Sequence, residues 1–181
     1  MSVSRAPVLV GANPGLRLYD GDTLTAYASV WQVDWSIHGG GTAIVLWRDG
    51  VVRLLGENAA LATWLERDFV RHFPEAEGLS WPEPVVEQQA VEVDIDLATG
   101  LQARAEGLEI RMSDVLDRRT FATDSFPLGG VEHSLSLVLA PCGRATLTVD
   151  GNPVAGAPQL SGEPGRPSSS AFVAVAEVWC R

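Results

Sequence analysis

The segment Ser36–Gly50, SIHGGGTAIVLWRDG, contains a histidine followed by three glycines at positions 38–41. Some hydrolases use a His-Gly-Gly-Gly turn as an oxyanion hole, whose backbone N–H groups face a serine in a Gly-x-Ser-x-Gly turn. The nearest match to that serine turn, GLSWP at residues 78–82, has proline where the second glycine is needed. We therefore interpret the glycines as a flexible bend between two strands, which could also line a ligand pocket.

The three histidines lack the spacing of a metal motif. His72 falls on the apolar side of a predicted helix, with Asp68 one turn earlier, and His133 shares a predicted strand face with Leu135 and Leu137. Packing accounts for both positions. Because the sequence has neither a His-x-His nor a His-x-x-x-His pair, we expect no metal site. It also has no Gly-x-Gly-x-x-Gly turn that opens a helix and no lysine for a phosphate-binding loop, so we expect no cofactor.

Three carboxylates alternate with aliphatic residues in the segment VEVDIDL. Glu92, Asp94 and Asp96 share one face of a predicted strand. Such a row could bind calcium or act as an acid–base pair. A half-buried strand also requires this alternation, so a solvated outer face is the preferred interpretation.

Six tryptophans occur in the chain, and Trp31, Trp35 and Trp47 flank the glycine bend. Tryptophan buries a large apolar area but needs a partner for its indole N–H, so it gathers in cores, at pocket walls and at interfaces. Core packing is the simplest interpretation. The functional alternative is a ligand site at this end of the sheet, formed by Trp31, Trp35, His38, Trp47 and His133.

The elements that would position these residues are mostly strands. Alternating polar and apolar residues, interrupted by turn dipeptides, predict antiparallel strands joined by hairpins. Asp-Gly is a strong hairpin signal because both central positions of the turn take positive φ. Four turns are predicted, at Asp49-Gly50, at Asp150-Gly151, near Thr99-Gly100 and at residues 20–22.

One principal helix is predicted over residues 58–73, with Asn58 as N-cap and Pro74 as stop signal. Its apolar residues recur at spacings of three and four, which is typical of a helix with one buried face. The buried stripe comprises Leu61, Trp64, Leu65, Phe69, His72 and Phe73, and the solvent side comprises Glu66, Arg67, Val70 and Arg71.

The remaining segments complete the fold prediction. The last strand, residues 171–179, is apolar on both faces except at Glu177, which is typical of a central strand covered on both sides. Residues 74–89 and 161–170 are rich in Pro, Gly and Ser and are predicted loops. The sequence therefore predicts one α+β, mainly β domain over residues 1–181: an antiparallel sheet or half-open β-barrel built from hairpins, with the helix packed on it.

Composition restricts the function. The net charge of −10 disfavours nucleic acid as a partner. All thirteen basic residues are arginine, so Schiff-base, P-loop and pyridoxal-phosphate chemistry lack their lysine. The initial residues, MSVSRAPVLVGANPG, resemble neither a signal peptide nor a membrane anchor, so we expect a cytoplasmic protein without membrane attachment, with Cys142 and Cys180 as free thiols.

Three functions stay open from the sequence. The first is a non-enzymatic domain that binds a small molecule or a protein partner at the Trp-rich, Gly-rich end of the sheet. The second is an enzyme that uses His38 or His133 beside a carboxylate for acid–base chemistry. The third is a structural subunit that forms a homodimer through an exposed apolar patch.

Overall fold

The structure, a computed structural model, describes residues 4–181, and the first three residues of the N-terminal segment discussed above lie outside the described part. Strands dominate it, so the predicted α+β, mainly β class is confirmed. The elements in chain order are β1 (Pro7–Ala12), β2 (Gly15–Asp20), β3 (Thr23–Ser36), β4 (Gly41–Arg48), β5 (Val51–Gly56), α1 (Ala59–Asp68), the 3-10 helices η1 (Val70–His72) and η2 (Pro74–Ala76), β6 (Val85–Gln88), β7 (Glu92–Asp96), β8 (Gly100–Ala105), β9 (Leu108–Val115), β10 (Arg119–Leu128), β11 (Val131–Val149), β12 (Asn152–Pro153), β13 (Leu160–Glu163), β14 (Arg166–Ser169) and β15 (Ala171–Cys180).

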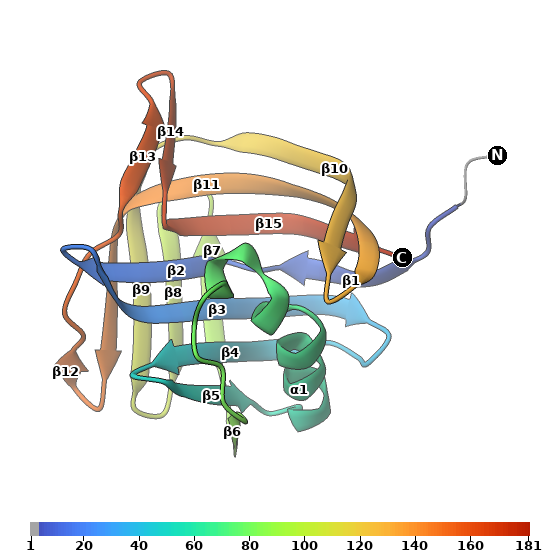
Figure 1. Cartoon of the computed structure of the whole chain (residues 1–181), viewed down its shortest axis with the longest axis horizontal. Helices are drawn as coiled ribbons and strands as arrows, with labels where there is room; N and C mark the ends of the chain where they lie inside the picture. Colours follow the sequence, from blue (N-terminus) through green and yellow to red (C-terminus); the bar gives the residue numbers. More distant parts are fainter. Residues whose placement is uncertain (1–3) are drawn as a thin grey trace.

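Two layers of strands belong to one bent sheet. The front layer contains β5, β4, β3, β1 and β2, β15 and the first half of β11, and β9, β8 and β7 run across behind it (Figure 1). Strand β11 joins the layers because it is 19 residues long: its first half pairs with β10 and β15, and its second half pairs with β9 and β12.

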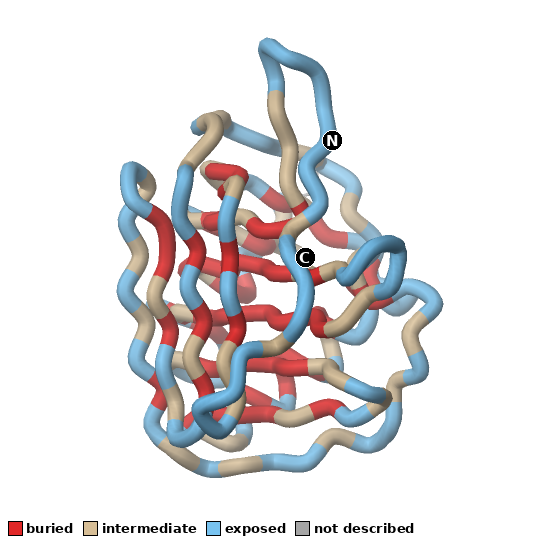
Figure 2. The backbone as a smooth tube through the Cα atoms, turned by 90° about the vertical axis from the view of Figure 1, so that its left-hand side faces the viewer, coloured by how far each residue is buried: buried red, intermediate tan, exposed pale blue. Residues whose placement is uncertain are grey.

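Two apolar cores lie on the two faces of the front layer. The first core, between this layer and α1, contains Trp31, Phe69 and Trp179. The second core, between the two layers of strands, contains Ile44 and Ile110. Figure 2 shows the buried residues concentrated along the strands that face these interiors. Strand β15 contributes to both cores, as its apolar pattern predicts.

All four predicted hairpin turns form. In the turn between β4 and β5, Asp49 and Gly50 have φ of 50° and 73°, and in the turn after β11, Asp150 and Gly151 have φ of 51° and 77°. The acidic row of β7 is exposed, as expected for a solvated face. These predictions are confirmed. They could be made from the sequence because each feature depends on residues that are close together in the chain.

The predicted helix is shorter than expected. Helix α1 begins after Asn58, whose side chain accepts a hydrogen bond from the N–H of Leu61 at 3.0 Å, and it ends at Asp68. The following 3-10 turn has fewer residues per turn, so it shifts the side-chain phase: Val70 is buried and His72 is exposed, opposite to the prediction. No helix within residues 4–181 is both long enough and apolar enough to cross a bilayer.

The two predicted loops contain regular structure, so that prediction is wrong in part. Residues 74–89 include η2 and β6, and β6 pairs in parallel with β5, in contrast to the antiparallel pairs around it. Residues 161–170 form most of the β13–β14 hairpin, which projects at the top of Figure 1. Short edge strands tolerate proline and glycine, and for this reason composition did not reveal them.

Candidate ligand-binding pocket

The glycine bend connects β3 to β4 and is closed by its own hydrogen bonds. The hydroxyl of Ser36 donates to the carbonyl oxygen of Gly39 at 2.6 Å and accepts from the N–H of His38 at 3.0 Å. The N–H of Gly39 donates to the carbonyl oxygen of Ser36 at 3.1 Å. Gly39 and Gly41 have φ of 91° and 145°, conformations that favour glycine. The structure therefore agrees with a bend.

The five residues predicted to form a ligand site are divided between core and surface. Trp31 and His133 are buried, and Trp47 is half-buried beside the first core. Trp35 is 48% exposed and His38 is also exposed. None of the five lines the pocket described below, and their role in ligand binding stays a prediction.

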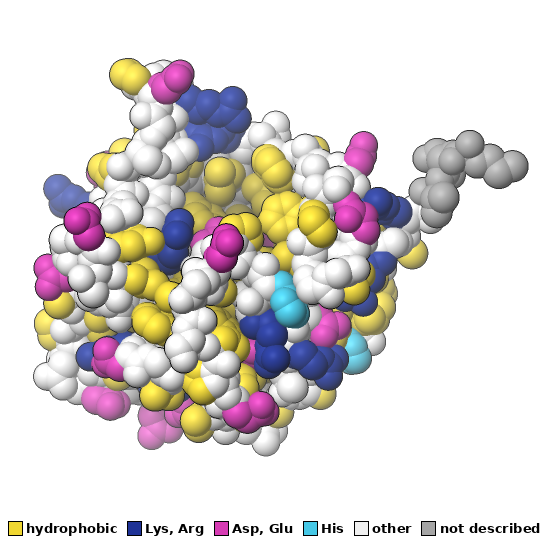
Figure 3. Space-filling model, viewed as in Figure 1, with side chains coloured by type: hydrophobic (Ala, Val, Ile, Leu, Met, Phe, Trp, Pro, Cys, Tyr) yellow, Lys and Arg dark blue, Asp and Glu magenta, His cyan; other side chains and the backbone are white. Residues whose placement is uncertain are grey.

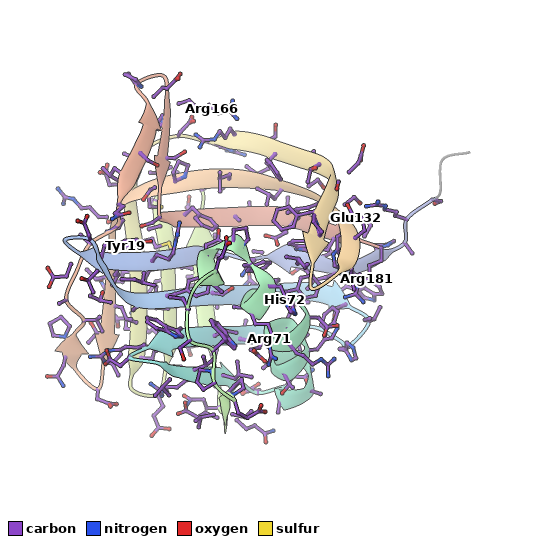
Figure 4. All side chains as sticks on the ribbon, viewed as in Figure 1. Tyr19, Arg71, His72, Glu132, Arg166 and Arg181 are labelled. Atoms are coloured by element: carbon purple, nitrogen blue, oxygen red, sulfur yellow. The ribbon has the colours of Figure 1, made fainter. Side chains whose placement is uncertain are left out.

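His133 packs in the first core. Its Nε2 accepts a hydrogen bond from Nε of Arg181 at 2.9 Å, and its ring lies 5.7 Å from Phe69 and 5.6 Å from Trp179 between centroids. Figure 4 shows Arg181 near the end of β15, beside the turn of the β10–β11 hairpin. Burial first, and the Arg181 cation second, lower the pKa of His133, which favours the neutral ring. These contacts fit the packing interpretation.

A hollow of about 240 Å³ opens on the front face. Figure 3 shows apolar side chains gathered in it, between the β13–β14 hairpin, β10 and the segment that follows α1. Strands β3, β15 and the β1–β2 junction form its floor, β10 and β11 form its walls, and the segment of η1 and η2 covers one side. Within the described part of the chain, six aromatic side chains line it: Tyr27, Phe73, Phe121, Phe126, Phe172 and Trp179.

A few polar side chains converge among these rings. The amide nitrogen of Asn13, where β1 gives way to β2, donates to the hydroxyl of Ser29 at 2.8 Å and to the carbonyl oxygen of Val30 at 2.9 Å. The phenol of Tyr27 is buried, and burial together with the nearby Glu75 carboxylate raises its pKa well above the ordinary value. Tyr27 therefore stays protonated and can serve as a hydrogen-bonding group in the pocket.

Glu177 is the buried acid of the pocket. It is 2% exposed, and its Oε1 accepts a hydrogen bond from the indole N–H of Trp179. Burial raises the pKa of Glu177 to about 8, and the Glu75 carboxylate contributes in the same direction. At neutral pH this carboxyl group is therefore mostly protonated.

A β-bulge in β15 precedes this residue. Val138 of β11 pairs with Val175, but Ser136 pairs with Val178, so three steps along β15 correspond to two along β11. Ala176 has φ of 49°, a left-handed conformation that is uncommon for alanine and occurs at bulges. The structure thus contains one extra residue at this point of the central strand.

The bulge determines which side chains face the pocket. Before it, Phe172 and Ala174 line the hollow, and after it Glu177 and Trp179 do. In a regular strand the same face would show every second residue, so Glu177 and Trp179 would point to the opposite side. The extra residue therefore places the carboxyl group and the indole in the pocket.

The pocket was not predicted from the sequence, although one signal of it is present there. Glu177 interrupts an otherwise apolar central strand, and a fully buried carboxyl group usually has a partner or a functional role. The aromatic residues give no such signal, since they come from β3, β10, β15 and the segment between η1 and η2 and meet only in the folded chain.

The chain matches no protein-family model, and comparisons with curated proteins and with solved structures also return no match. Within residues 4–181, no group of three or more His, Cys, Asp or Glu side chains is arranged to hold a metal ion. The geometry of the pocket is therefore the basis for a functional proposal.

Proposed function

We propose that the protein binds a small, mainly apolar molecule in the pocket of the front face. The observation that carries this proposal is a concave site lined by aromatic rings, with a few polar groups converging in it, which is the usual composition of small-molecule sites. A cavity of about 150 Å³ holds benzene. The volume of about 240 Å³ therefore suits a ligand of about ten non-hydrogen atoms.

The rings that line the pocket support one another without a ligand. Phe73 stacks on Trp179 with 6.0 Å between centroids, and Phe126 meets the same indole edge-on at 5.3 Å. At the mouth, Phe121 is 42% exposed. A preformed hollow with an exposed aromatic rim supports a binding role, because exposed apolar patches on a protein surface often mark ligand or partner sites.

An ion pair with a buried carboxylate supports the segment of η1 and η2 that covers one side of the pocket, called the covering segment below. The carboxylate of Glu66 accepts hydrogen bonds from Arg71 at 2.8 and 2.9 Å and from the indole of Trp81 at 2.8 Å. Figure 4 shows Arg71 beside α1, on the segment that leads to the pocket. The network joins α1 to residues on both sides of Phe73 and Glu75 in the chain, so it supports the segment that covers the pocket.

Titration with three compact aromatic probes tests the proposal: phenethyl alcohol, phenethylamine and phenylacetate. At ten times its dissociation constant, a bound probe adds about 1.4 kcal/mol to the unfolding free energy. For a chain of this size, that corresponds to a rise in melting temperature of roughly 3 to 6 °C. Calorimetry gives the affinity independently.

Two variants locate the binding site. Leu137→Trp places a larger side chain in the pocket wall and should abolish binding, whereas Ile37→Trp changes an exposed residue outside the pocket and should bind as the wild type does. Failure of all three probes to bind the wild type would contradict the proposal. Equal affinity of the wild type and Leu137→Trp would do the same.

A further inference from the structure

The charged side chains that line the pocket are both acidic. They are Glu75, on η2, and Glu177, on β15. Arg17, which pairs opposite Tyr27 between β2 and β3, is outside the lining, and its guanidinium lies 6.0 Å from the ring of Tyr19. Arg17 is close enough to the phenol of Tyr27 to lower its pKa, although burial and Glu75 outweigh that effect. Among the residues that line the pocket, a negatively charged ligand would meet two carboxyl groups, whereas a positively charged ligand would meet complementary charge.

One oxygen of the Glu177 carboxyl group is available to a ligand. Its Oε1 accepts the indole N–H of Trp179, and residues 4–181 provide no donor to its Oε2. An ionised carboxylate with one neutral donor is costly in an apolar site, and a ligand cation within hydrogen-bond distance offsets that cost.

Aromatic rings complete the surroundings of this carboxyl group. Trp179 lies two residues from Glu177 on the same strand face, and Phe126 packs against its indole. Aromatic faces attract organic cations through their quadrupoles, most strongly when the cation is removed from water. A carboxylate among aromatic rings therefore recognises an ammonium group on an apolar body better than either feature does alone.

We propose that the ligand is a compact apolar amine bound in its protonated form, with the Glu177 carboxylate as its counter-ion. This inference rests on the proposed binding function and specifies the chemical class of the ligand. The apolar body occupies the space among the rings, and the ammonium group donates to Oε2 of Glu177.

Binding of such a ligand releases a proton. In the empty pocket the carboxyl group is protonated at neutral pH, and it ionises when the ammonium group arrives, so the proton passes to solvent. The ionisable groups that line the pocket beside Glu177 are Glu75 from η2 and Tyr27 from β3, and the lining residues from β10 and β11 are apolar. Arg17 of β2 lies outside the lining, near Tyr27. Glu75 adds negative charge in the pocket and favours the cation further.

Calorimetric titration of the full chain with the same three probes tests the inference. Phenethylamine should bind at least tenfold more tightly at about pH 8 than phenethyl alcohol, because a hydrogen bond to a charged group contributes more than a neutral one. Phenylacetate should bind most weakly. Between about pH 6 and pH 8 the affinity for the amine should rise by up to tenfold per pH unit, whereas the affinity for the alcohol should stay constant.

Glu177→Gln keeps the shape and the acceptor for Trp179 but removes the charge. It should lose at least tenfold of the amine affinity and all of its pH dependence, with alcohol binding unchanged, which also shows that the variant is folded. Glu106→Gln, at the exposed turn between β8 and β9, should bind all three probes as the wild type does.

The outcomes separate this inference from the proposed function. If the alcohol binds as tightly as the amine, or if Glu177→Gln retains the amine affinity, the pocket binds ligands but the amine assignment is wrong. If phenylacetate binds most tightly, the assignment is also wrong. If no probe binds, the proposed function itself fails.

Discussion

At the scale of single residues, Glu177 links the pocket to the stability of the fold. Its carboxyl group has an ordinary pKa of 4.5, and burial raises this to about 8 in the folded state. Below about pH 4.5 the group is protonated in both the folded and the unfolded state, so it leaves stability unchanged. Between these two values the unfolded state releases the proton and the folded state keeps it, so the free energy of unfolding falls as pH rises.

Other carboxylates act in the opposite direction. Arg53 donates to Glu87 at 2.6 Å, and this hydrogen bond lowers the pKa of Glu87. The stability contributed by Glu87 is present above its ordinary pKa and is lost as pH falls. For this reason, the effect of Glu177 has to be measured as a difference between two proteins at each pH.

Glu177→Gln should therefore gain stability relative to the wild type as pH rises from about 5 to 8. The difference in unfolding free energy should change by at most about 1.4 kcal/mol per pH unit, in favour of the variant. Urea titrations of both proteins across this range provide the measurement. Glu106→Gln should follow the wild type, and parallel curves for Glu177→Gln and the wild type would contradict a raised pKa.

At the scale of elements, the covering segment is held by hydrogen bonds to the buried carboxylate of Glu66 on α1. Sequence periodicity placed Glu66 on the solvent side of the helix, and the structure buries it at 1% exposure beneath Arg71 and Trp81. The periodicity was wrong here because the segment after η2 folds back over the helix and covers that side. Arg71 and Trp81, which follow Glu66 in the chain, donate the hydrogen bonds that compensate for burial of its carboxylate. The apolar periodicity of the helix does not predict these contacts.

Arg71→Ala should destabilise the fold by about 3 kcal/mol, because it leaves the buried Glu66 carboxylate without its cation. It should also weaken probe binding, since Phe73 and Glu75 lose their support. Thermal unfolding and calorimetry measure the two effects. Arg67→Ala breaks only the exposed pair with Asp68 and should change stability by less than about 1 kcal/mol; an equal effect of both variants would show that burial of Glu66 is unimportant.

Local elements were predictable from sequence and long-range ones were not. The residues of the Asp49-Gly50 and Asp150-Gly151 turns favour the positive φ that a two-residue hairpin turn requires. Each of these hairpins can therefore be predicted from two residues. The bulge at Ala176 depends on pairing between β15 and β11, and the aromatic lining depends on elements that lie far apart in the sequence, from β3 to β15. The α+β class could therefore be predicted, and the pocket could not.

At the scale of the whole molecule, β11 connects the two cores. Its residue Leu135 packs in the first core, and Leu147, in the second half of the same strand, packs in the second core. Both cores also share the front layer as a common wall. Loss of either core therefore removes support from the other, and we expect the described chain to unfold as one unit.

Leu147→Ala tests this coupling. Removal of a buried leucine side chain should cost about 2 to 5 kcal/mol. The loss should appear to the same extent in tryptophan fluorescence, which reports on Trp31, Trp64 and Trp179 in the first core, and in circular dichroism, which reports on all strands. Coincident urea transitions would confirm one cooperative unit, and an unaffected fluorescence transition would show that the two cores unfold separately.

The bulge in β15 has a consequence for how such a pocket could arise. Substitution changes one side chain at a time, but gain or loss of a single codon next to Ala176 would exchange the two faces of the strand beyond it. Glu177 and Trp179 would move into or out of the hollow together, while Phe172 and Ala174 stayed in place. An in-frame insertion of one residue could thus bring a second carboxyl group and an indole into the hollow in a single evolutionary step.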